Sequence, residues 1–416
     1  MQALYFSPRD CWPVTTGARL RDFHLAREVA RDCQLTYLGF QRPDSAETAI
    51  RRETLPALGA EVILVPRRSG YGPAKIVRGL LGPAPISVLN YQSSLMTAEL
   101  RRLLHTQHFD LVQMEGIHLF AYLDLLREGP GAPRLISDWH NIESELMGRY
   151  AENSPSMPRK LYARRTAYLL RRLELTLLRR CDAHVVCSER EKQLLLARVP
   201  TARIVVVGNG VDVESHADTA IEEACRQFPG LAGDGQRSCI LFVGSMDYHA
   251  NIDAALFFAR EIWPLIRAAR PDLEFLIVGS RPTAEIVSLG GQAGISVTGT
   301  VKDVRPFYRR ASMVVIPARV ASGTRLKALE AMAAGVPVVS TTLGVEGLDI
   351  TPGENAVLAD AAEDFAKAVL SLRPETREWE RLSEGGRRFV AAHYDWAHLG
   401  RTLRALYAEQ LREAAA

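Results

Sequence analysis

A predicted strand, a turn of small residues and a predicted helix follow one another in the second half of the chain. Residues 312–317 (SMVVIP) form a short apolar run, and residues 325–334 have helical spacing. The turn between them contains Ser322, Gly323 and Thr324. A turn of this kind points free backbone N–H groups and the positive end of the helix dipole outward, which favours binding of a diphosphate.

Three charged residues lie in the first turns of this predicted helix. Arg325 and Lys327 place two cations in the first turn, and Glu330 lies one turn further on. A carboxylate at that position can accept hydrogen bonds from two vicinal ribose hydroxyls. The pattern therefore predicts a nucleotide-diphosphate site. The alternative is an i,i+3 ion pair between Lys327 and Glu330 on an exposed helix.

Two segments carry a resemblance to a known family. LEAMAAGVPVVSTTLGVEGL (residues 329–348) and FVGSMDYHAN (residues 242–251) resemble the donor half of GT-B glycosyltransferases, specifically the large retaining family 4. The resemblance implies that Glu330 binds the nucleotide ribose and that Gly299 and Val301 contact the base. It also implies that cations and helix ends, in place of a metal ion, stabilise the leaving diphosphate.

The chain departs from the pattern of this family at three positions. A Glu-x7-Glu pattern would place an additional glutamate at position 322, where the chain has Ser322. The family usually has arginine directly after Gly244 and lysine a few residues later, but the chain has Ser245 and Ala250. We therefore expect Arg325 and Lys327 to take over the diphosphate charge.

The first loop of the N-terminal half, PRDCWPVTTGARLR, contains Gly17, with Arg19 and Arg21 near the start of a helix. Family 4 proteins often have a glycine loop here that borders the donor phosphates. The alternative is an ordinary proline and glycine turn before an amphipathic helix.

Two further candidates follow predicted strands of the N-terminal half. His140 comes just after the strand RLISD, where family members often have a histidine that contacts the donor sugar, and Asp138 and Glu143 could orient or charge it. A loop histidine held by hydrogen bonds is the alternative. Glu115 ends the segment DLVQME and is interpreted either as a catalytic base or as a solvated loop acid.

Predicted strands and helices alternate along the chain, which indicates parallel sheets covered on both faces. The fold class is α/β, and the resemblance implies a GT-B architecture of two Rossmann-like domains facing a central cleft. We expect an acceptor-side domain over residues 1–208, a donor domain over residues 209–395 and a helix over residues 396–416 that crosses back to the first domain. The predicted strands are ALYFS, LTYLGF, EVILVP, DLVQM, RLISD, AHVVCS and ARIVVVG, then CILFVG, EFLIVG, ISVTG, SMVVIP and VPVVS.

The composition excludes several classes of protein. The chain has 416 residues, of which 47% are hydrophobic and 24% charged, enough for two cores. It contains no apolar stretch of membrane-spanning length and no signal peptide pattern at its start, so a cytoplasmic protein is expected. A net charge of +3 is too small to indicate nucleic acid. Motifs for dinucleotides, P-loops, serine hydrolases and zinc proteases are absent, and no cofactor or metal is expected.

Residues 159–180 form a basic segment with eight Lys or Arg and one acid. Leucine and tyrosine recur among the charges at helical spacing, which predicts a helix with one apolar face. The structural interpretation is a helix packed on the first domain with a solvated basic face. The functional interpretation is peripheral contact with anionic lipid on the inner face of the cell membrane.

The sequence and the resemblance together indicate a retaining, metal-independent transferase. It would move a sugar from a nucleotide-diphosphate sugar to a glycan or lipid-linked acceptor in cell-envelope or exopolysaccharide synthesis. Two alternatives stay open, a sugar-nucleotide epimerase of the same fold and a non-catalytic subunit that binds a nucleotide sugar. The donor sugar, its base, the acceptor and the oligomeric state are not determined by the sequence.

Overall fold

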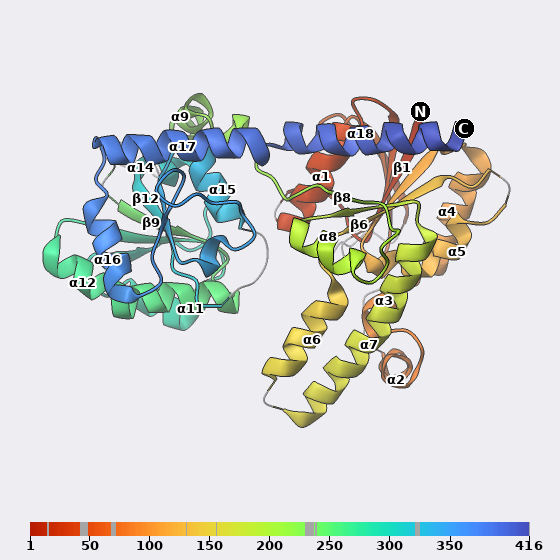
Figure 1. Ribbon diagram of the computed structural model, residues 1–416, viewed down its shortest axis with the longest axis horizontal. Coiled ribbons are helices and arrows are strands. Elements are labelled where there is room, and N and C mark those ends of the chain that lie inside the picture. Colours follow the sequence, from red (N-terminus) through yellow and green to blue (C-terminus); the bar gives the residue numbers. More distant parts are fainter. Residues whose placement is uncertain are drawn as a thin grey trace. The chain divides into compact units, whose positions relative to one another are not determined.

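The structure is a computed structural model in which the chain divides into two compact units (Figure 1). The first unit consists of Met1–Gly208 and Leu399–Ala416, and the second of Asn209–His398. The residues that the structure describes are 1–14, 16–41, 49–67, 72–129, 131–154, 156–228, 237, 239–320 and 325–415.

The first unit is built on an eight-stranded sheet in the order β3-β4-β2-β1-β5-β6-β7-β8. All neighbouring strands run parallel except β3, which pairs antiparallel with β4. The strands are β1 (Gln2–Ser7), β2 (Gln34–Phe40), β3 (Arg51–Leu55), β4 (Ala60–Val65), β5 (Leu111–Glu115), β6 (Arg134–Trp139), β7 (Ala183–Val186) and β8 (Ile204–Val206).

The prediction of a parallel α/β sheet is confirmed, and β3 is the described strand of this sheet that it missed. The other strands are almost continuous apolar runs, as expected for a sheet covered on both faces. β3 reads RRETL and lies at the edge of the sheet with its middle residues exposed. A polar edge strand has no apolar pattern from which it could be predicted.

Helices cover the first sheet on both faces (Figure 1). The helices of this unit are α1 (Gly17–Val29), α2 (Pro73–Leu81), α3 (Ile86–Leu89), α4 (Ser94–Thr106), α5 (Leu123–Leu126), α6 (Glu143–Asn153), α7 (Met157–Arg180), α8 (Glu189–Leu196) and α18 (Trp396–Ala415), with a 3-10 turn at Ile117–Tyr122. The end of the chain returns to this unit through α18. The hydroxyl of Tyr407 donates to Gln113 at 2.8 Å, and Arg404 pairs with Glu28.

The basic segment forms α7, which packs against α6 as a helical hairpin that projects from the sheet (Figure 1). The buried face of α7 includes Leu169, Leu170, Leu177 and Leu178. None of the helices in the described part of the chain is both long enough and apolar enough to pass through a bilayer.

The second unit contains a six-stranded parallel sheet in the order β11-β10-β9-β12-β13-β14. Five strands were predicted, whereas β14 pairs over only two residues and gives no usable pattern. The strands are β9 (Cys239–Val243), β10 (Glu274–Val278), β11 (Ile295–Val297), β12 (Ala311–Ile316), β13 (Val338–Ser340) and β14 (Val357–Leu358).

Two apolar clusters cover the two faces of the second sheet. One contains Phe242, Phe258 and Phe275, and the other contains Leu241, Val314 and Leu329. The covering helices are α9 (Asp218–Gln227), α11 (His249–Phe257), α12 (Trp263–Ala269), α13 (Ala284–Leu289), α14 (Arg305–Arg310), α15 (Leu326–Ala333), α16 (Ala362–Ser371) and α17 (Arg377–His393). Short turns lie at Glu214–His216, Phe258–Ile262 and Leu343–Val345.

Candidate functional site

The loops after β9 and β10 are joined at the carboxyl edge of the second sheet. The backbone N–H of Gly244 donates to Val278 at 3.0 Å, and that of Met246 donates to Ser280 at 2.8 Å. A Cβ atom on Gly279 would lie 1.6 Å from the carbonyl oxygen of Gly244. Only glycine at position 279 therefore allows the two loops to approach so closely.

Lys327 lies in the first turn of α15 and reaches toward the loop after β9. Its Nζ donates to Oδ1 of Asn251 at 2.6 Å and lies 4.6 Å from the centre of the Phe242 ring. Burial, together with the neighbouring charge of Arg325, lowers the pKa of Lys327 to about 8. The lysine is therefore an enclosed cation at this edge of the sheet.

Glu330 takes a different partner, so the ion pair considered for Lys327 and Glu330 is not formed. Its Oε2 accepts a hydrogen bond from the hydroxyl of Tyr308 at 3.1 Å. Tyr308 belongs to α14 and is fully buried. Burial of the carboxylate raises the pKa of Glu330. The nearby His216 and the hydrogen bond from Tyr308 lower it, but the effect of burial is larger. The tyrosine was not predicted, because its position in RPFYRR indicates only a buried aromatic side chain.

Arg325 directly precedes α15, and its side chain is only 12% exposed. A guanidinium nitrogen lies 3.4 Å from the carboxylate of Glu346. The structure thus places both predicted cations at the start of α15. The predicted residues Ser322, Gly323 and Thr324 lie outside the described residues.

Gly299 and Val301 follow β11 at the same edge of the sheet. Gly299 has a φ of +71°, which favours glycine, and a Cβ there would meet open space. Val301 is partly buried and packs against one of the apolar clusters. Their contact with a base stays a prediction.

Ser245 and Asp247 form a polar turn after β9, and the guanidinium of Arg281 contacts this turn. The hydroxyl of Ser245 donates to Asp247 at 2.7 Å, and the guanidinium of Arg281 pairs with Asp247 at 3.0 Å. Asp247 is therefore a turn residue. Arg281 comes from the loop after β10, and sequence reasoning missed it because only the sheet order brings that loop beside Ser245.

The first sheet has its own charged cluster, centred on His140 just after β6. The Nε2 atom of His140 lies 2.8 Å from Glu115 Oε2 and 3.3 Å from Asp22 Oδ1. Both carboxylates are fully buried, whereas the histidine side chain is 17% exposed. Burial alone would lower the pKa of His140, but hydrogen bonds and charge from the two carboxylates raise it to about 9.

Asp22, which comes from α1, is held by two further groups. The hydroxyl of Ser7 donates to its carboxylate at 2.8 Å, and Arg9 pairs with it at 3.0 Å. Burial would raise the pKa of Asp22, but Arg9 and His140 lower it to about 2. Asp22 is therefore ionised at neutral pH, and the histidine is protonated.

The structure corrects the expected partners of His140. Asp138 does not orient it, because both oxygens of Asp138 accept hydrogen bonds from Arg21, at 2.9 and 3.0 Å. Glu143 does not hold His140 either, since the carboxylates at its Nε2 belong to Glu115 and Asp22. The residues that hold His140 are Asp22, which was not predicted, and Glu115.

Burial decides the alternatives for Arg21, whereas the contact of Gly17 with the donor stays a prediction. Arg21 is fully buried and also donates to the carbonyls of Val207 and Gly208, so the structural alternative holds for it. Gly17 is the exposed first residue of α1, and Arg19 pairs with Asp10 at 2.7 Å.

Glu115 is not a solvated loop acid. It is the last residue of β5, it is fully buried, and it accepts a hydrogen bond from Gln113 at 2.7 Å. The interpretation as an exposed acid is therefore wrong, because the strand continues to this residue. One oxygen or nitrogen atom each of Asp22, Glu115 and His140 lie within 4.8 Å of one another, an arrangement that could also hold a metal ion.

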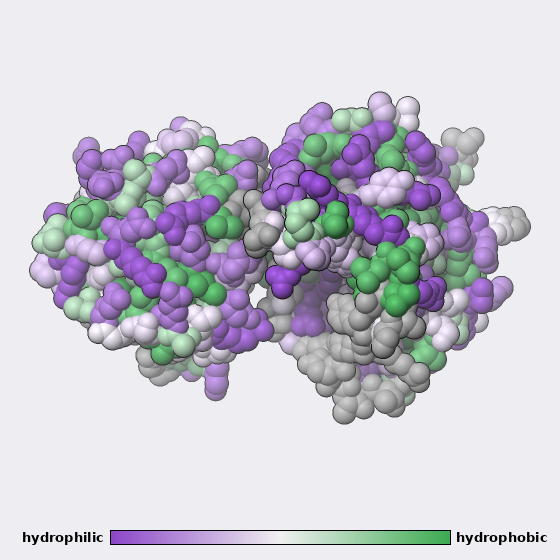
Figure 2. Space-filling view, turned by 90° about the horizontal axis from the view of Figure 1, so that it is seen from below, coloured by the Kyte–Doolittle hydropathy of each residue, from purple (hydrophilic) through white to green (hydrophobic). Residues whose placement is uncertain are grey.

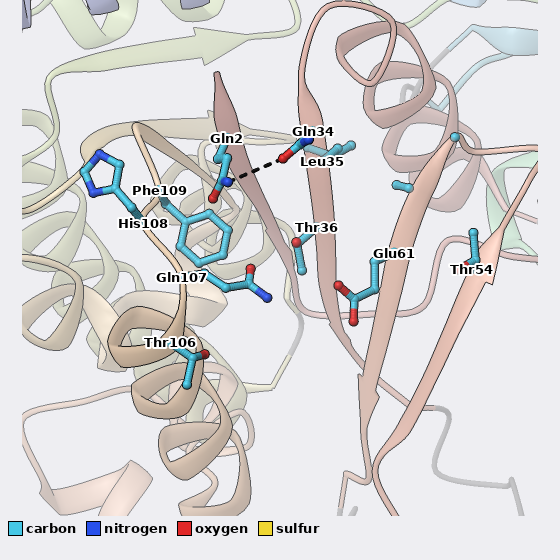
Figure 3. A pocket seen from close by; sticks show the side chains of 12 residues that line it. Gln2, Gln34, Leu35, Thr36, Thr54, Glu61, Thr106, Gln107, His108 and Phe109 are labelled. Carbon is cyan, nitrogen blue, oxygen red and sulfur yellow. Dashed lines mark hydrogen bonds between the residues drawn. The ribbon is translucent and has the colours of Figure 1, made fainter.

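A pocket of about 600 Å³ opens at the opposite edge of the first sheet, where its strands begin (Figure 3). Its lining is mostly polar and includes Gln2, Gln34, Thr36, Glu61 and Gln107, together with the rings of His108 and Phe109. None of the predicted site residues lines this pocket. In open α/β sheets ligands bind at the carboxyl ends of the strands, so size alone does not make this pocket the candidate site.

The first prediction concerns the charge of His140. Replacing Glu115 with glutamine (Glu115→Gln) should lower the pKa of His140 from about 9 toward its ordinary value, measured by NMR titration of the assigned ring signals. The raised pKa means that the ion pair stabilises the fold most below about pH 6.5 and loses this effect as the pH rises through about 9. The stability difference between parent and variant should therefore shrink over that interval.

Glu99→Gln is the matched control, because Glu99 is also a buried acid of this unit but pairs with Arg52 and Arg102. It should leave the pKa of His140 unchanged. An unchanged pKa in Glu115→Gln would show that Glu115 does not charge the histidine.

Comparison with known proteins identifies both halves of the chain. A family model described as "Glycosyltransferase Family 4" matches residues 52–215, and one described as "Glycosyl transferases group 1" matches residues 237–373. The chain is 30% identical over 210 residues to a phosphatidyl-myo-inositol mannosyltransferase of Propionibacterium freudenreichii, covering 49% of this chain and 50% of that protein. It is 28% identical over 253 residues to the lipopolysaccharide core biosynthesis mannosyltransferase LpcC of Rhizobium leguminosarum, covering 58% of this chain and 69% of that protein.

The chain spans about half the length of the first curated relatives that it matches. Solved structures are similar over nearly the whole chain. Sucrose-phosphate synthase of Thermosynechococcus elongatus has a TM-score of 0.68 at 17% identity and covers 100% of both chains. Anabaena HepE in complex with UDP and glucose has a TM-score of 0.63 at 14% identity and covers 97% of this chain and 99% of its own. With two parallel α/β units and a family match in each half, this chain belongs to the GT-B glycosyltransferases of family 4.

Proposed function

We propose that this chain transfers a sugar, with retention of configuration, from a nucleotide-diphosphate sugar to a glycan or lipid-linked acceptor. The observation that carries the proposal is the grouping at the start of α15. Arg325 directly precedes the helix, Lys327 lies in its first turn, and the carboxylate of Glu330 follows one turn later. Two cations followed by an acid match the order of diphosphate and ribose in a nucleotide sugar.

Glu330 is proposed to bind the ribose. Its carboxylate already accepts one hydrogen bond from Tyr308 on the protein side. A carboxylate has about four lone-pair sites, so it retains acceptor capacity for two vicinal hydroxyls. HepE, which shares the fold, has been solved with UDP and with UDP-glucose, which supports a nucleoside diphosphate sugar as the donor class.

Arg325 and Lys327 are proposed to stabilise the diphosphate as it leaves. Negative charge develops on that group when the bond to the sugar breaks, and fixed cations in an enclosed site stabilise this charge strongly. Both side chains are largely enclosed, and burial lowers the pKa of each. The leaving phosphate itself would accept the acceptor proton, so the proposed reaction needs no cofactor and no metal ion.

His140 is proposed to donate a hydrogen bond to a sugar hydroxyl. Two carboxylates hold its Nε2 and keep the ring protonated. An imidazolium donates hydrogen bonds from both ring nitrogens. Because Nε2 contacts the carboxylates, Nδ1 is the atom that would donate to the sugar hydroxyl. His140 would then orient the sugar, because a ring with a pKa of about 9 is a poor base at neutral pH.

A lipid-linked acceptor in cell-envelope synthesis is supported by the surface of the α6 and α7 hairpin. Exposed apolar side chains on α6, α7 and α2 are Leu146, Tyr150, Met157, Leu161, Tyr168, Val77, Leu80 and Leu81. Arg165 of α7 donates to the carbonyl of Gly82 at the end of α2, at 2.9 Å, so the two helices adjoin. Seen from below, the first unit carries hydrophobic groups beside hydrophilic ones (Figure 2).

Basic side chains accompany these apolar residues, since Arg164, Arg165, Arg171 and Arg172 are all exposed on α7. Apolar side chains that enter the lipid boundary and basic ones that attract anionic headgroups together favour peripheral binding. Two relatives are named for phosphatidyl-myo-inositol and for lipopolysaccharide core biosynthesis. These names agree with an acceptor at a membrane surface.

The second prediction tests the ribose site. Glu330→Ala should weaken nucleotide binding by about 10- to 150-fold, because a hydrogen bond to a charged group contributes about 1.5 to 3 kcal/mol. Calorimetric titration with UDP, GDP and ADP measures the loss and identifies the base. Glu274→Ala is the control, since Glu274 pairs with Arg310 in the same unit. Equal affinity of parent and Glu330→Ala would exclude the ribose assignment.

The third prediction tests the diphosphate charge. Arg325→Ala and Lys327→Ala should each reduce sugar transfer about 100-fold, and the double variant should nearly abolish it, because each removes a cation from the leaving group. Release of nucleoside diphosphate from a panel of nucleotide sugars, with and without acceptor, is the measurement. Arg260→Ala and Lys367→Ala remove exposed, ion-paired cations of the same unit and should leave the rate unchanged. Transfer at the parent rate by the double variant would place the diphosphate elsewhere.

The fourth prediction tests the membrane surface. The protein should sediment with anionic vesicles at low salt and dissociate from them as the salt concentration rises, because exposed charges are screened beyond about 8 Å at physiological ionic strength. It should stay in the supernatant with neutral vesicles. Exchanging Arg164, Arg165, Arg171 and Arg172 for glutamine should weaken sedimentation without changing nucleotide affinity.

A matched control removes the same amount of charge from the second unit, by exchanging the exposed residues Arg226, Arg260, Arg381 and Arg388 for glutamine. This control should sediment like the parent. If the α7 variant also sediments like the parent, the basic face of α7 is only a solvated surface, and a soluble acceptor becomes the better proposal.

A further inference from the structure

Asn251 connects two elements of the candidate donor site. It belongs to α11, and its side-chain amide uses both ends. Its Nδ2 donates to the backbone carbonyl of Ser245 at 2.9 Å, and its Oδ1 accepts from Nζ of Lys327 at 2.6 Å. One side chain thus links the loop after β9 to the first turn of α15.

Gly244 and Phe242 fix the positions of the Asn251 amide and the Lys327 ammonium. A Cβ atom on Gly244 would lie 2.7 Å from Nδ2 of Asn251 and 2.9 Å from its Cγ, so a larger residue would displace the amide. On the other side, the Phe242 ring lies 4.6 Å from Nζ of Lys327. The ammonium is therefore fixed between an amide oxygen and the face of an aromatic ring.

This contact explains how the chain can work without cations at positions 245 and 250. Ser245 is neutral, and Ala250 is buried at the start of α11. Neither can offer charge to a ligand at the loop after β9. Lys327 comes from a different element, and it reaches that loop through the amide of Asn251.

We propose that Asn251 is a positioning residue, which holds the ammonium of Lys327 beside the loop after β9 so that it supplies the phosphate-binding charge missing from positions 245 and 250. The inference rests on the function proposed above. An ammonium has three N–H donors, and Asn251 uses one of them, which leaves donors for a phosphate.

The hydrogen bond from Lys327 to Asn251 should also favour the charged form of the lysine. Burial and the neighbouring Arg325 lower the pKa of Lys327 to about 8, and Glu330 raises it. The amide oxygen of Asn251 accepts from the ammonium and so favours the charged form. Because a neutral lysine cannot bind phosphate electrostatically, loss of this acceptor should weaken the donor site most at alkaline pH.

The experiment compares Asn251→Ala and Asn251→Asp with the control Asn355→Ala. Asn355 is also a buried asparagine of the second unit, but it holds the backbone N–H of Thr351. The first readout needs no activity. It is the pH at which an amine-reactive reagent labels Lys327 half-maximally, determined by mass spectrometry with the exposed Lys302 as internal reference.

In Asn251→Ala this pH should fall by about one unit, and in Asn251→Asp it should rise by about one unit, because a carboxylate favours the ammonium more than an amide does. Asn355→Ala should match the parent. The same half-labelling pH in the parent and in both Asn251 variants would overturn the proposal. If Asn251→Ala fails to fold, which its circular dichroism would reveal, Asn251→Asp carries the test alone.

The second readout is turnover as a function of pH. The KM for the nucleotide sugar should rise about 10-fold in Asn251→Ala at neutral pH, and its rate should decline at a lower pH than that of the parent. In Asn251→Asp the rate should again persist to the alkaline pH at which the parent is active. A parent that turns over no nucleotide sugar would contradict the proposed function, while the labelling result would still decide whether Asn251 positions Lys327.

Discussion

Parallel pairing of the strands is the constraint on which both candidate sites depend. Within each sheet the described strands run in one direction, apart from β3, so the loops that follow them meet at one edge. In the first unit this edge gathers Glu115 and His140, and in the second it gathers Gly244 and Lys327. Apolar runs form most of the paired backbone, and the polar site residues lie at the strand ends or in the segments that follow.

Both edges enclose a cation, and the two environments change its pKa in opposite directions. His140 contacts the carboxylates of Asp22 and Glu115, which outweigh the effect of burial and raise the pKa of the histidine to about 9. Lys327 has a neutral amide and an aromatic ring as its nearest partners, so burial dominates and lowers its pKa to about 8. His140 is therefore permanently charged at neutral pH, whereas the charge of Lys327 depends on what contacts it.

The departures from the family pattern have a physical counterpart in the second unit. With Ser245 and Ala250 at the expected cation positions, the charge at this edge is supplied from other elements, by Arg325 and Lys327 at the start of α15 and by Arg281 after β10. A phosphate responds to the field of nearby cations whatever segment provides them. The same binding property can thus be built from different parts of one sheet edge.

The sequence by itself determined the helices and strands whose apolar residues recur at regular spacing. It predicted the apolar strands, the helix that begins near Arg325 and contains Glu330, the basic helix over residues 159–180 and the position of His140 after a strand. It missed β3 and β14, which are polar or short. The partners of the functional side chains, Asp22 for His140, Tyr308 for Glu330 and Asn251 for Lys327, were decided only by the tertiary structure. Apolar periodicity reports which face of an element is buried, but a hydrogen bond depends on which element lies across from it, and this follows from the order of strands in the sheet.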